Sequence, residues 1–69
     1  MNLKKYWNQM TNELKARWPD LTAADLTYIA GDETKLIEMV ERRRHISSEE
    51  ARRDVNDFLN HLNLRQRLA

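Results

Sequence analysis

The single proline and the single glycine of this chain both fall within one short stretch, residues 18–31. Pro19 disfavours the helical conformation at Trp18, so a first helix is expected to end near that residue. Gly31 can supply the left-handed residue that commonly follows the last turn of a helix, so a second helix should end there. Because these helix breakers occur nowhere else, the sequence predicts helix over nearly the whole chain.

Four residues between these breakers indicate where the second helix begins. Thr22 is the expected N-cap, and Asp25, three positions later, can return a hydrogen bond to it in a capping box. Leu21 and Leu26 flank the cap as a hydrophobic staple. Asp25 also lies in the first turn, where the helix dipole favours a negative charge. We therefore interpret this stretch as a corner of the fold rather than a site of chemistry.

The spacing of apolar residues predicts the first and third helices. Steps of three and four residues place one set of side chains on a single helical face, namely Leu3, Trp7, Met10, Leu14 and Trp18. A third helix should begin after an N-cap at Asp32 or Thr34 and end at Arg44. His45 then takes the position where glycine is usual, so we expect it in the left-handed conformation.

A fourth helix repeats the start signals of the second. Ser47 is the expected N-cap, Glu50 is the acid at N3, and Ile46 and Ala51 form the staple. The inward face of this helix is predicted to be Ala51, Val55, Phe58 and Leu62, and the helix should fray from Asn63 onward. The matching start signals fit either an internal duplication or, as we favour, the ordinary capping of any helical protein.

Together these signals predict an all-α fold, a compact four-helix bundle of two roughly orthogonal helical hairpins. Residues 1–69 should form a single domain with its core region at 4–62 and a frayed C-terminal tail. Ile29 and Ala30 should face inward on the second helix. The predicted core comprises Trp7, Met10, Leu14, Trp18, Leu21, Leu26, Ile29, Leu36, Ile37, Val40, Ile46, Ala51, Val55, Phe58 and Leu62.

Composition excludes several function classes. The chain has no cysteine, which rules out disulfides and thiolate chemistry. Twelve basic and eleven acidic residues give a net charge of +1, which argues against a dedicated nucleic-acid coat. No stretch approaches the ~18 apolar residues of a membrane span, and nothing resembles a signal peptide. We therefore expect no membrane insertion and a cytoplasmic protein.

The assembled pattern resembles the CsbD-like family of small bacterial proteins associated with general stress. The resemblance covers roughly residues 7 to 58 and is most specific between Trp18 and Gly31. It rests on Trp7, Met10, Leu14, Trp18, Leu21, Thr22, Asp25, Leu26, Ile29, Gly31, Leu36, Val40, Arg43, Ile46, Ser47, Glu49, Glu50, Ala51 and Val55. It implies a compact four-helix fold of two roughly orthogonal hairpins and a stress-response setting, without an established enzymatic activity, cofactor or ligand.

Four departures from the family pattern bear on any shared partner. A Lys-Gly pair is replaced by Thr11-Asn12, and an aromatic-Gly pair is replaced by Arg44-His45. Pro19 replaces a glycine, and Ala23-Ala24 replaces a more acidic pair. If the lost positions contact a common partner, this chain should engage that partner differently.

The residues support two hypotheses of function. The first is a non-enzymatic stress-response-associated protein that acts through surface interactions with a partner not identified by the sequence. An exposed patch of Tyr6, Trp7 and Tyr28 could serve a protein partner, although ordinary boundary packing of these rings is the favoured interpretation. The alternative is a weak nucleic-acid binder whose polyanion contacts are Arg42, Arg43, Arg44, Arg52 and Arg53.

Two histidine pairs are the remaining candidates for chemistry. His45 with Glu49, and Asp57 with His61, are spaced to share one face of a helix. Neither pair has an evident third ligand, so we interpret both as surface pairs rather than a metal or acid–base site. No phosphate loop or nucleophile motif is present, so we expect no catalytic residues, no cofactor and no enzyme activity.

Overall fold

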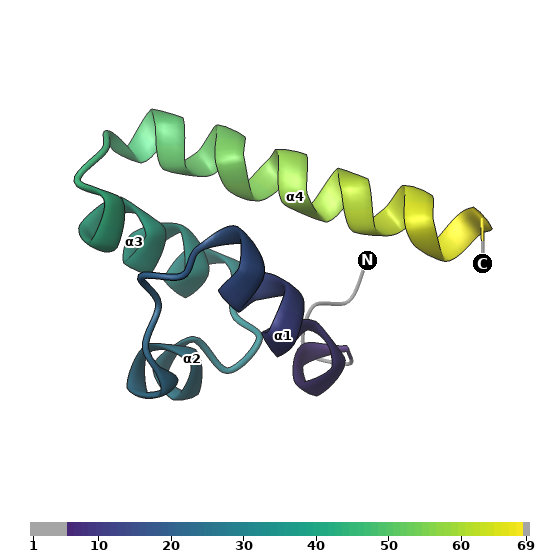
Figure 1. Cartoon of the computed structure of the whole chain (residues 1–69). Coiled ribbons are helices and arrows are strands. Elements are labelled where there is room, and N and C mark those ends of the chain that lie inside the picture. The colour runs from purple at the N-terminus through teal and green to yellow at the C-terminus, as the bar shows by residue number, and fades with distance from the viewer. Residues whose placement is uncertain (1–5, 69) are drawn as a thin grey trace.

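The structure is a computed structural model that describes the backbone of residues 6–68 and the side chains of residues 6–62. Over these residues it is all-helical, with four helices and no strand: α1 (Trp7–Arg17), α2 (Ala23–Ile29), α3 (Glu33–Arg44) and α4 (Ser48–Leu68). The long helix α4 extends along one side of the molecule, with α1 and α3 beneath it and α2 farthest away (Figure 1). Helix α3 packs against both α4 and α2.

Three expectations fall partly or wholly outside the described residues. Leu3 and the start of the predicted core region lie within residues 1–5, which the structure does not describe. The predicted fraying concerns residues 63–69, whose side chains also lie outside the described part, although the backbone of α4 runs to Leu68.

The turn between α1 and α2 forms as its residues predict. Helix α1 ends at Arg17, and the Trp18 N–H still donates to the Leu14 carbonyl at 2.8 Å. The Leu21 N–H then donates to the Trp18 carbonyl at 3.0 Å, which closes the turn around Pro19. The conformational limit that proline places on its preceding residue thus ends α1 at the predicted position.

The end of α2 differs from the expectation by one residue. Ala30, rather than Gly31, is the helix C-cap, and both residues are left-handed with φ of 45° and 84°. Ala30 was expected to face inward, and that prediction is wrong: its side chain is exposed. Because Ala30 has already left the helical conformation, its side chain no longer continues the inward face of α2 that Ile29 occupies.

Side-chain caps begin the last two helices. Asp32, and not Thr34, caps α3, because its Oδ1 accepts the Lys35 N–H at 3.1 Å. His45 ends α3 in the left-handed conformation with φ of 55°, which confirms the prediction. The Ser47 Oγ accepts the Glu50 N–H at 3.1 Å, which confirms the cap of α4.

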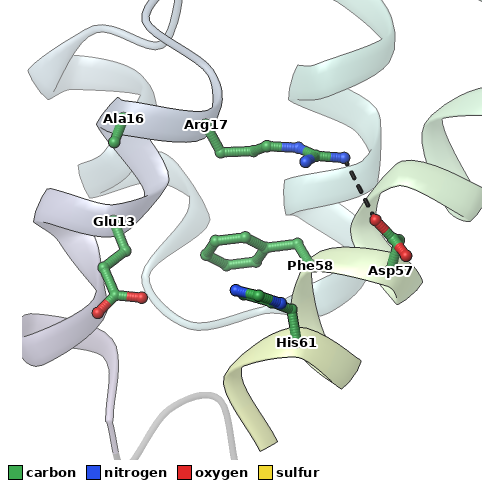
Figure 2. A pocket seen from close by; sticks show the side chains of 6 residues that line it. All are labelled: Glu13, Ala16, Arg17, Asp57, Phe58 and His61. Atoms are coloured by element: carbon green, nitrogen blue, oxygen red, sulfur yellow. Dashed lines mark ion pairs between the residues drawn. The ribbon is translucent and has the colours of Figure 1, made fainter. Parts of the chain in front are cut away.

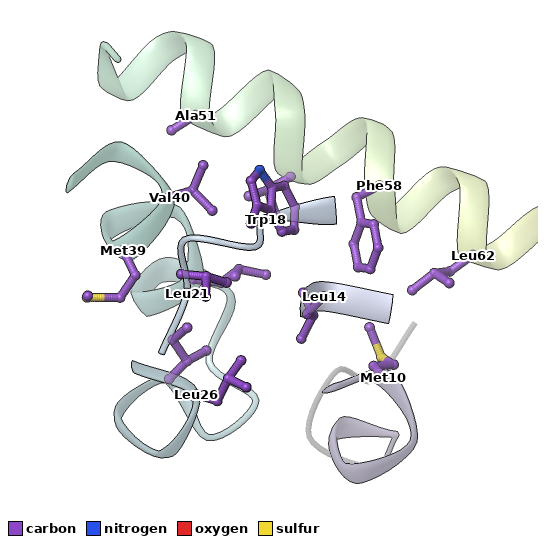
Figure 3. Packing of buried hydrophobic residues seen from close by; sticks show 13 residues of the cluster. Met10, Leu14, Trp18, Leu21, Leu26, Met39, Val40, Ala51, Phe58 and Leu62 are labelled. Atoms are coloured by element: carbon purple, nitrogen blue, oxygen red, sulfur yellow. The ribbon is translucent and has the colours of Figure 1, made fainter. Parts of the chain in front are cut away.

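The core forms where α1, α3 and α4 meet and extends to α2 (Figure 3). The fully buried ring of Trp18 lies 5.1 Å from that of Phe58, centroid to centroid, at an interplanar angle of 59°. This tilted geometry is favourable for aromatic pairs. The buried apolar residues are Met10, Leu14, Trp18, Leu21, Leu26, Ile29, Leu36, Met39, Val40, Ala51, Val55, Phe58 and Leu62.

Four residues differ from the predicted core. Trp7, Ile37 and Ile46 are only partly buried against it, whereas Met39, omitted from the prediction, is 5% exposed. Trp7 begins α1 and Ile46 lies in the turn before α4, so both rest at the edge of the core. Met39 lies three residues after Leu36 and therefore shares its helical face, whereas Ile37 is rotated away from that face.

Candidate functional site

The predicted polyanion contacts lie on either side of the turn between α3 and α4. We call them the arginine cluster: Arg42, Arg43, Arg44, Arg52 and Arg53. The first three form the last turn of α3, and the other two lie in α4 shortly after its start. The turn between these helices forms one end of the α3–α4 pair (Figure 1). The structure therefore brings the ends of both arginine-bearing segments to the same part of the molecule.

Arg43 differs from the rest of the cluster because it is bound to a buried carboxylate. Its Nε donates to Asp25 Oδ2 and its Nη2 donates to Asp25 Oδ1, each at 2.8 Å. Asp25 is only 5% exposed and is the one buried charged residue in the described part of the chain. This two-bond geometry is the strong form of an arginine–carboxylate pair, and it ties the start of α2 to the end of α3.

The same carboxylate completes the capping box of α2. Asp25 Oδ2 accepts the Thr22 N–H at 3.0 Å, while Thr22 Oγ1 accepts the Asp25 N–H at 3.1 Å. The pKa of Asp25 is lowered from an ordinary 3.8 to about 2, mainly by the hydrogen bond from Arg43. Burial acts in the opposite direction and raises this pKa, whereas the hydrogen bond from the Thr22 N–H lowers it further. Asp25 in turn raises the pKa of Arg43. We call this unit of Thr22, Asp25 and Arg43 the clamp.

The other four arginines are exposed. Arg42 approaches Glu38 at 3.7 Å and Arg53 approaches Glu49 at 3.5 Å, both as pairs one helical turn apart. Arg44 and Arg52 make no ion pair with any residue that the structure describes. Exposed pairs of this kind are worth little, so these four guanidinium groups can exchange partners readily.

Neither histidine pair forms a metal site within the described residues. His45 lies in the turn before α4, while Asp57 and His61 both lie on α4. Among residues 6–62 no group of three or more histidine, aspartate or glutamate side chains is placed to hold a metal ion. Asp57 instead approaches Arg17 of α1 at 3.5 Å.

An open hollow of about 360 Å³ separates α1 from α4 near this ion pair (Figure 2). Phe58 and His61 line it from α4, and Glu13, Ala16 and Arg17 line it from α1, with the Arg17–Asp57 pair bridging the two helices. A second hollow, of about 470 Å³, lies between α1 and α2 and is lined by Trp7, Asn8, Thr11, Leu26, Thr27 and Ala30.

The three aromatic residues considered for a surface patch have different surroundings. Tyr6 and Trp7 are partly buried against the core. Tyr28 is 47% exposed and contacts α3, where its hydroxyl donates to Glu38 Oε1 at 3.2 Å and the Lys35 Nζ lies 5.1 Å from its ring centroid. Of these three aromatic residues, Tyr28 is therefore the one whose ring is exposed.

The sequence interpretation missed the pairing of Asp25 with Arg43. Asp25 was assigned to the cap alone, and Arg43 to the exposed cluster. A signal was present, because Arg43 lies seven residues after the buried Leu36 and three after the buried Val40, and so continues their side of α3, although its own side chain is 44% exposed. A basic residue on an apolar helix face predicts a buried acidic partner.

No helix among the described residues is both long enough and apolar enough to cross a membrane.

Comparison with known proteins finds relatives with similar sequences in several bacteria. A UPF0337 protein of Pseudomonas aeruginosa is 37% identical over 60 residues, which cover 87% of this chain and 92% of the relative. A UPF0337 protein of Bordetella pertussis is 35% identical over 75% of this chain and 79% of its own length. A UPF0337 protein of Nitrosomonas europaea is 34% identical over 81% of this chain, but the match spans only 60% of that relative.

No family model and no solved structure matches the chain. The identity to the Pseudomonas aeruginosa protein nevertheless extends over nearly the whole of that relative. UPF0337 denotes small proteins whose molecular function is uncharacterised, and it corresponds to the family that the cap and tryptophan pattern resembles. The chain therefore belongs to the UPF0337, or CsbD-like, family.

Proposed function

We propose that this chain is a non-enzymatic cytoplasmic protein, associated with the stress response, that acts by binding a partner at its surface. The hydrogen bonds of Asp25 support the non-enzymatic part of this proposal. A general acid or base works best with a pKa near the operating pH, whereas the pKa of Asp25 is about 2. Its oxygens are already engaged by Thr22 and Arg43, so this buried charge supports structure rather than proton transfer.

The family resemblance supports the stress-response setting. We expect the abundance of the protein to rise when cells enter stress, and crosslinking in stressed cells to capture it with a partner. Nuclease treatment before capture separates protein partners from nucleic acid. A crosslinked species that survives nuclease and requires the folded chain supports the proposal. Unchanged abundance and the absence of any crosslinked species would contradict it.

Nucleic-acid binding through the arginine cluster is a second candidate, supported by the exposure of four of its members. Arg44 and Arg52 make no ion pair within the described part, and Arg42 and Arg53 make only long, exposed ones. Acidic neighbours offset these cations, namely Glu41, Glu49, Glu50 and Asp54. We therefore expect weak binding that falls steeply between ~50 and ~200 mM salt.

The test of this candidate leaves Arg43 in place because that residue holds the clamp. Arg44→Gln combined with Arg52→Gln should weaken binding to single- or double-stranded nucleic acid at low salt. Lys15→Gln combined with Arg17→Gln removes the same charge from α1 and should change binding much less. Equal losses in the two double variants, or no binding at low salt, would exclude the cluster as the contact.

The arrangement of the helices as a four-helix bundle is also a proposal. We infer that α1–α2 and α3–α4 form two roughly orthogonal hairpins that fold as one domain over residues 1–69. The packing of α3 against α4 supports the second hairpin, and the packing of α3 against α2 joins the two hairpins. Interhelical angles from a solution NMR structure, together with coincident unfolding of backbone and tryptophan signals, would test it. Separate unfolding transitions would contradict the single domain.

A further inference from the structure

The exposed ring of Tyr28 is held in place by side chains of α3. The phenol donates to Glu38 Oε1 at 3.2 Å, and the Lys35 Nζ lies 5.1 Å from the ring centroid. Glu38 also approaches Arg42 at 3.7 Å. A ring fixed by such contacts has less rotamer freedom to lose on association, and exposed tyrosine with neighbouring arginine is typical of interface centres. The 47% exposure of this fixed ring leaves it available for an intermolecular contact.

The charges on the side of α3 that faces Tyr28 alternate in sign. From the N-cap onward they are Asp32, Lys35, Glu38 and Arg42: negative, positive, negative, positive. Glu33 and Glu41 are also acidic, but helical geometry places them on other sides of α3. Asp32, Glu38 and Arg42 all act on the phenol of Tyr28, whose pKa is raised mainly by the Glu38 hydrogen bond. We call Tyr28 and the four alternating charges the Tyr28 strip.

Read in the opposite direction, the same four charges have the opposite sign at each position, so two antiparallel copies of this strip are complementary. When two copies of α3 lie antiparallel about a two-fold axis, Lys35 of each copy faces Glu38 of the other. The outer charges, Asp32 and Arg42, likewise face each other across the axis. A two-fold interface uses the same surface on both copies and requires this kind of self-complementarity. Because the strip is neutral, with Glu38 beside the ring, it suits neither a nucleic acid nor another polyanion.

We propose that the Tyr28 strip is a self-association surface, on which a second copy of this chain docks antiparallel with the two Tyr28 rings close to the two-fold axis. The contact is small and its ion pairs are exposed, so association is weak and reversible. Self-association through this strip does not require that the protein bind any other partner. It also does not involve the clamp, which lies between α2 and α3.

Sedimentation velocity of the full chain over a concentration series tests this surface. The wild type should show concentration-dependent dimerisation at or below about 1 mM, the weak end of measurable affinity. Lys35→Glu alone places acids against acids, and Glu38→Lys alone places cations against cations. Each variant should weaken self-association by more than about tenfold.

Mixing the two variants gives the sharpest outcome. The equimolar mixture pairs the two acids of one chain with the two cations of the other, so association should return although neither variant self-associates alone. Tyr28→Ala should weaken association without reversing any charge. Arg53→Glu and Glu49→Arg, which alter an exposed pair on α4, are matched controls that should leave it unchanged. Circular dichroism establishes that each variant is folded.

Three results would overturn the proposal. The wild type could remain monomeric up to about 1 mM, in which case the ring would serve a different partner. The mixture could fail to associate while each variant is folded. The α4 control reversals could weaken association as much as the strip reversals do, which would show a general charge effect rather than this surface.

Discussion

Two of the capped helix starts, those of α2 and α4, use similar local chemistry but have different surroundings. At the start of α2, Asp25 is buried, returns a hydrogen bond to Thr22 and binds Arg43 through two further bonds. At the start of α4, Glu50 occupies the equivalent position with its side chain exposed, and its N–H donates to Ser47. The same capping signal therefore serves a tertiary contact in one case and only local helix formation in the other.

The comparison also divides the arginine cluster. All five side chains are exposed, but Arg43 is bound to the buried carboxylate of the α2 cap, whereas the other four arginines have only exposed ion-pair partners or none among the described residues. Residues that are adjacent in sequence thus have different roles because of the helix face on which they lie. The surface available to a polyanion is smaller than the number of arginines implies.

The largest expected effect tests whether the two regions fold together. Trp18 precedes the α2 cap, and its ring packs on Phe58 of α4. Trp18→Ala should lower the free energy of unfolding by roughly 3–5 kcal/mol through the cavity it leaves. A domain of this size has about that much stability in total, so circular dichroism should show a largely unfolded chain. A fully folded variant would contradict the burial of this ring.

The next effect separates the two N3 acids directly. Asp25→Ala should cost about 2–4 kcal/mol, because it removes the returned cap bond and the bonds from a charged guanidinium. Glu50→Ala should stay within about 0.5 kcal/mol, since its side chain is exposed. Urea unfolding of both variants measures the difference. Equal losses would mean that the tertiary contact of Asp25 adds nothing to the cap.

The cap hydroxyls should differ less than the acids. Thr22→Ala should cost about 1 kcal/mol, as is typical for loss of an N-cap. Ser47→Ala removes the same kind of bond at α4 and should cost a similar amount. Thermal unfolding of the pair checks this. A much larger cost at either hydroxyl would show that it supports more than its own helix start.

The α2 cap should dominate the loss of stability at acidic pH. The pKa of Asp25 is lowered by folding, so its contribution is fully present above pH 3.8 and is lost as the pH falls toward about 2. The wild type should therefore lose stability across this window. Asp25→Asn should lose less over the same range in urea unfolding experiments. Parallel losses in both proteins would contradict ionisation of Asp25 as the cause.

Local signals predicted most of the helix ends. Each of these helix ends is determined by neighbours within a few residues, so the sequence contains the information needed to place it. They are the end of α1 before Pro19, the N-caps at Thr22 and Ser47, and the left-handed C-cap at His45. Ala30 was placed incorrectly because the position of a left-handed cap can shift by one residue. The prediction that Ala30 faces inward was based only on its spacing from Leu26 along the helix.

The clamp could not be assigned from local signals. Asp25 and Arg43 lie eighteen positions apart and meet only because α2 packs on α3. Asp25 is buried and Arg43 is exposed, and the choice of partner depends on the relative placement of the two helices. The contacts of Tyr28 with Lys35 and Glu38 depend on that same placement.

A double-mutant cycle in urea tests most directly whether Asp25 and Arg43 act as one structural unit. Arg43→Gln should destabilise the wild type clearly but have little further effect in the Asp25→Asn background. Arg42→Gln, the exposed neighbour, should be near neutral in both backgrounds. Additive effects of Arg43→Gln and Asp25→Asn, within about 0.3–0.5 kcal/mol, would show that the two residues are not coupled and would contradict the clamp.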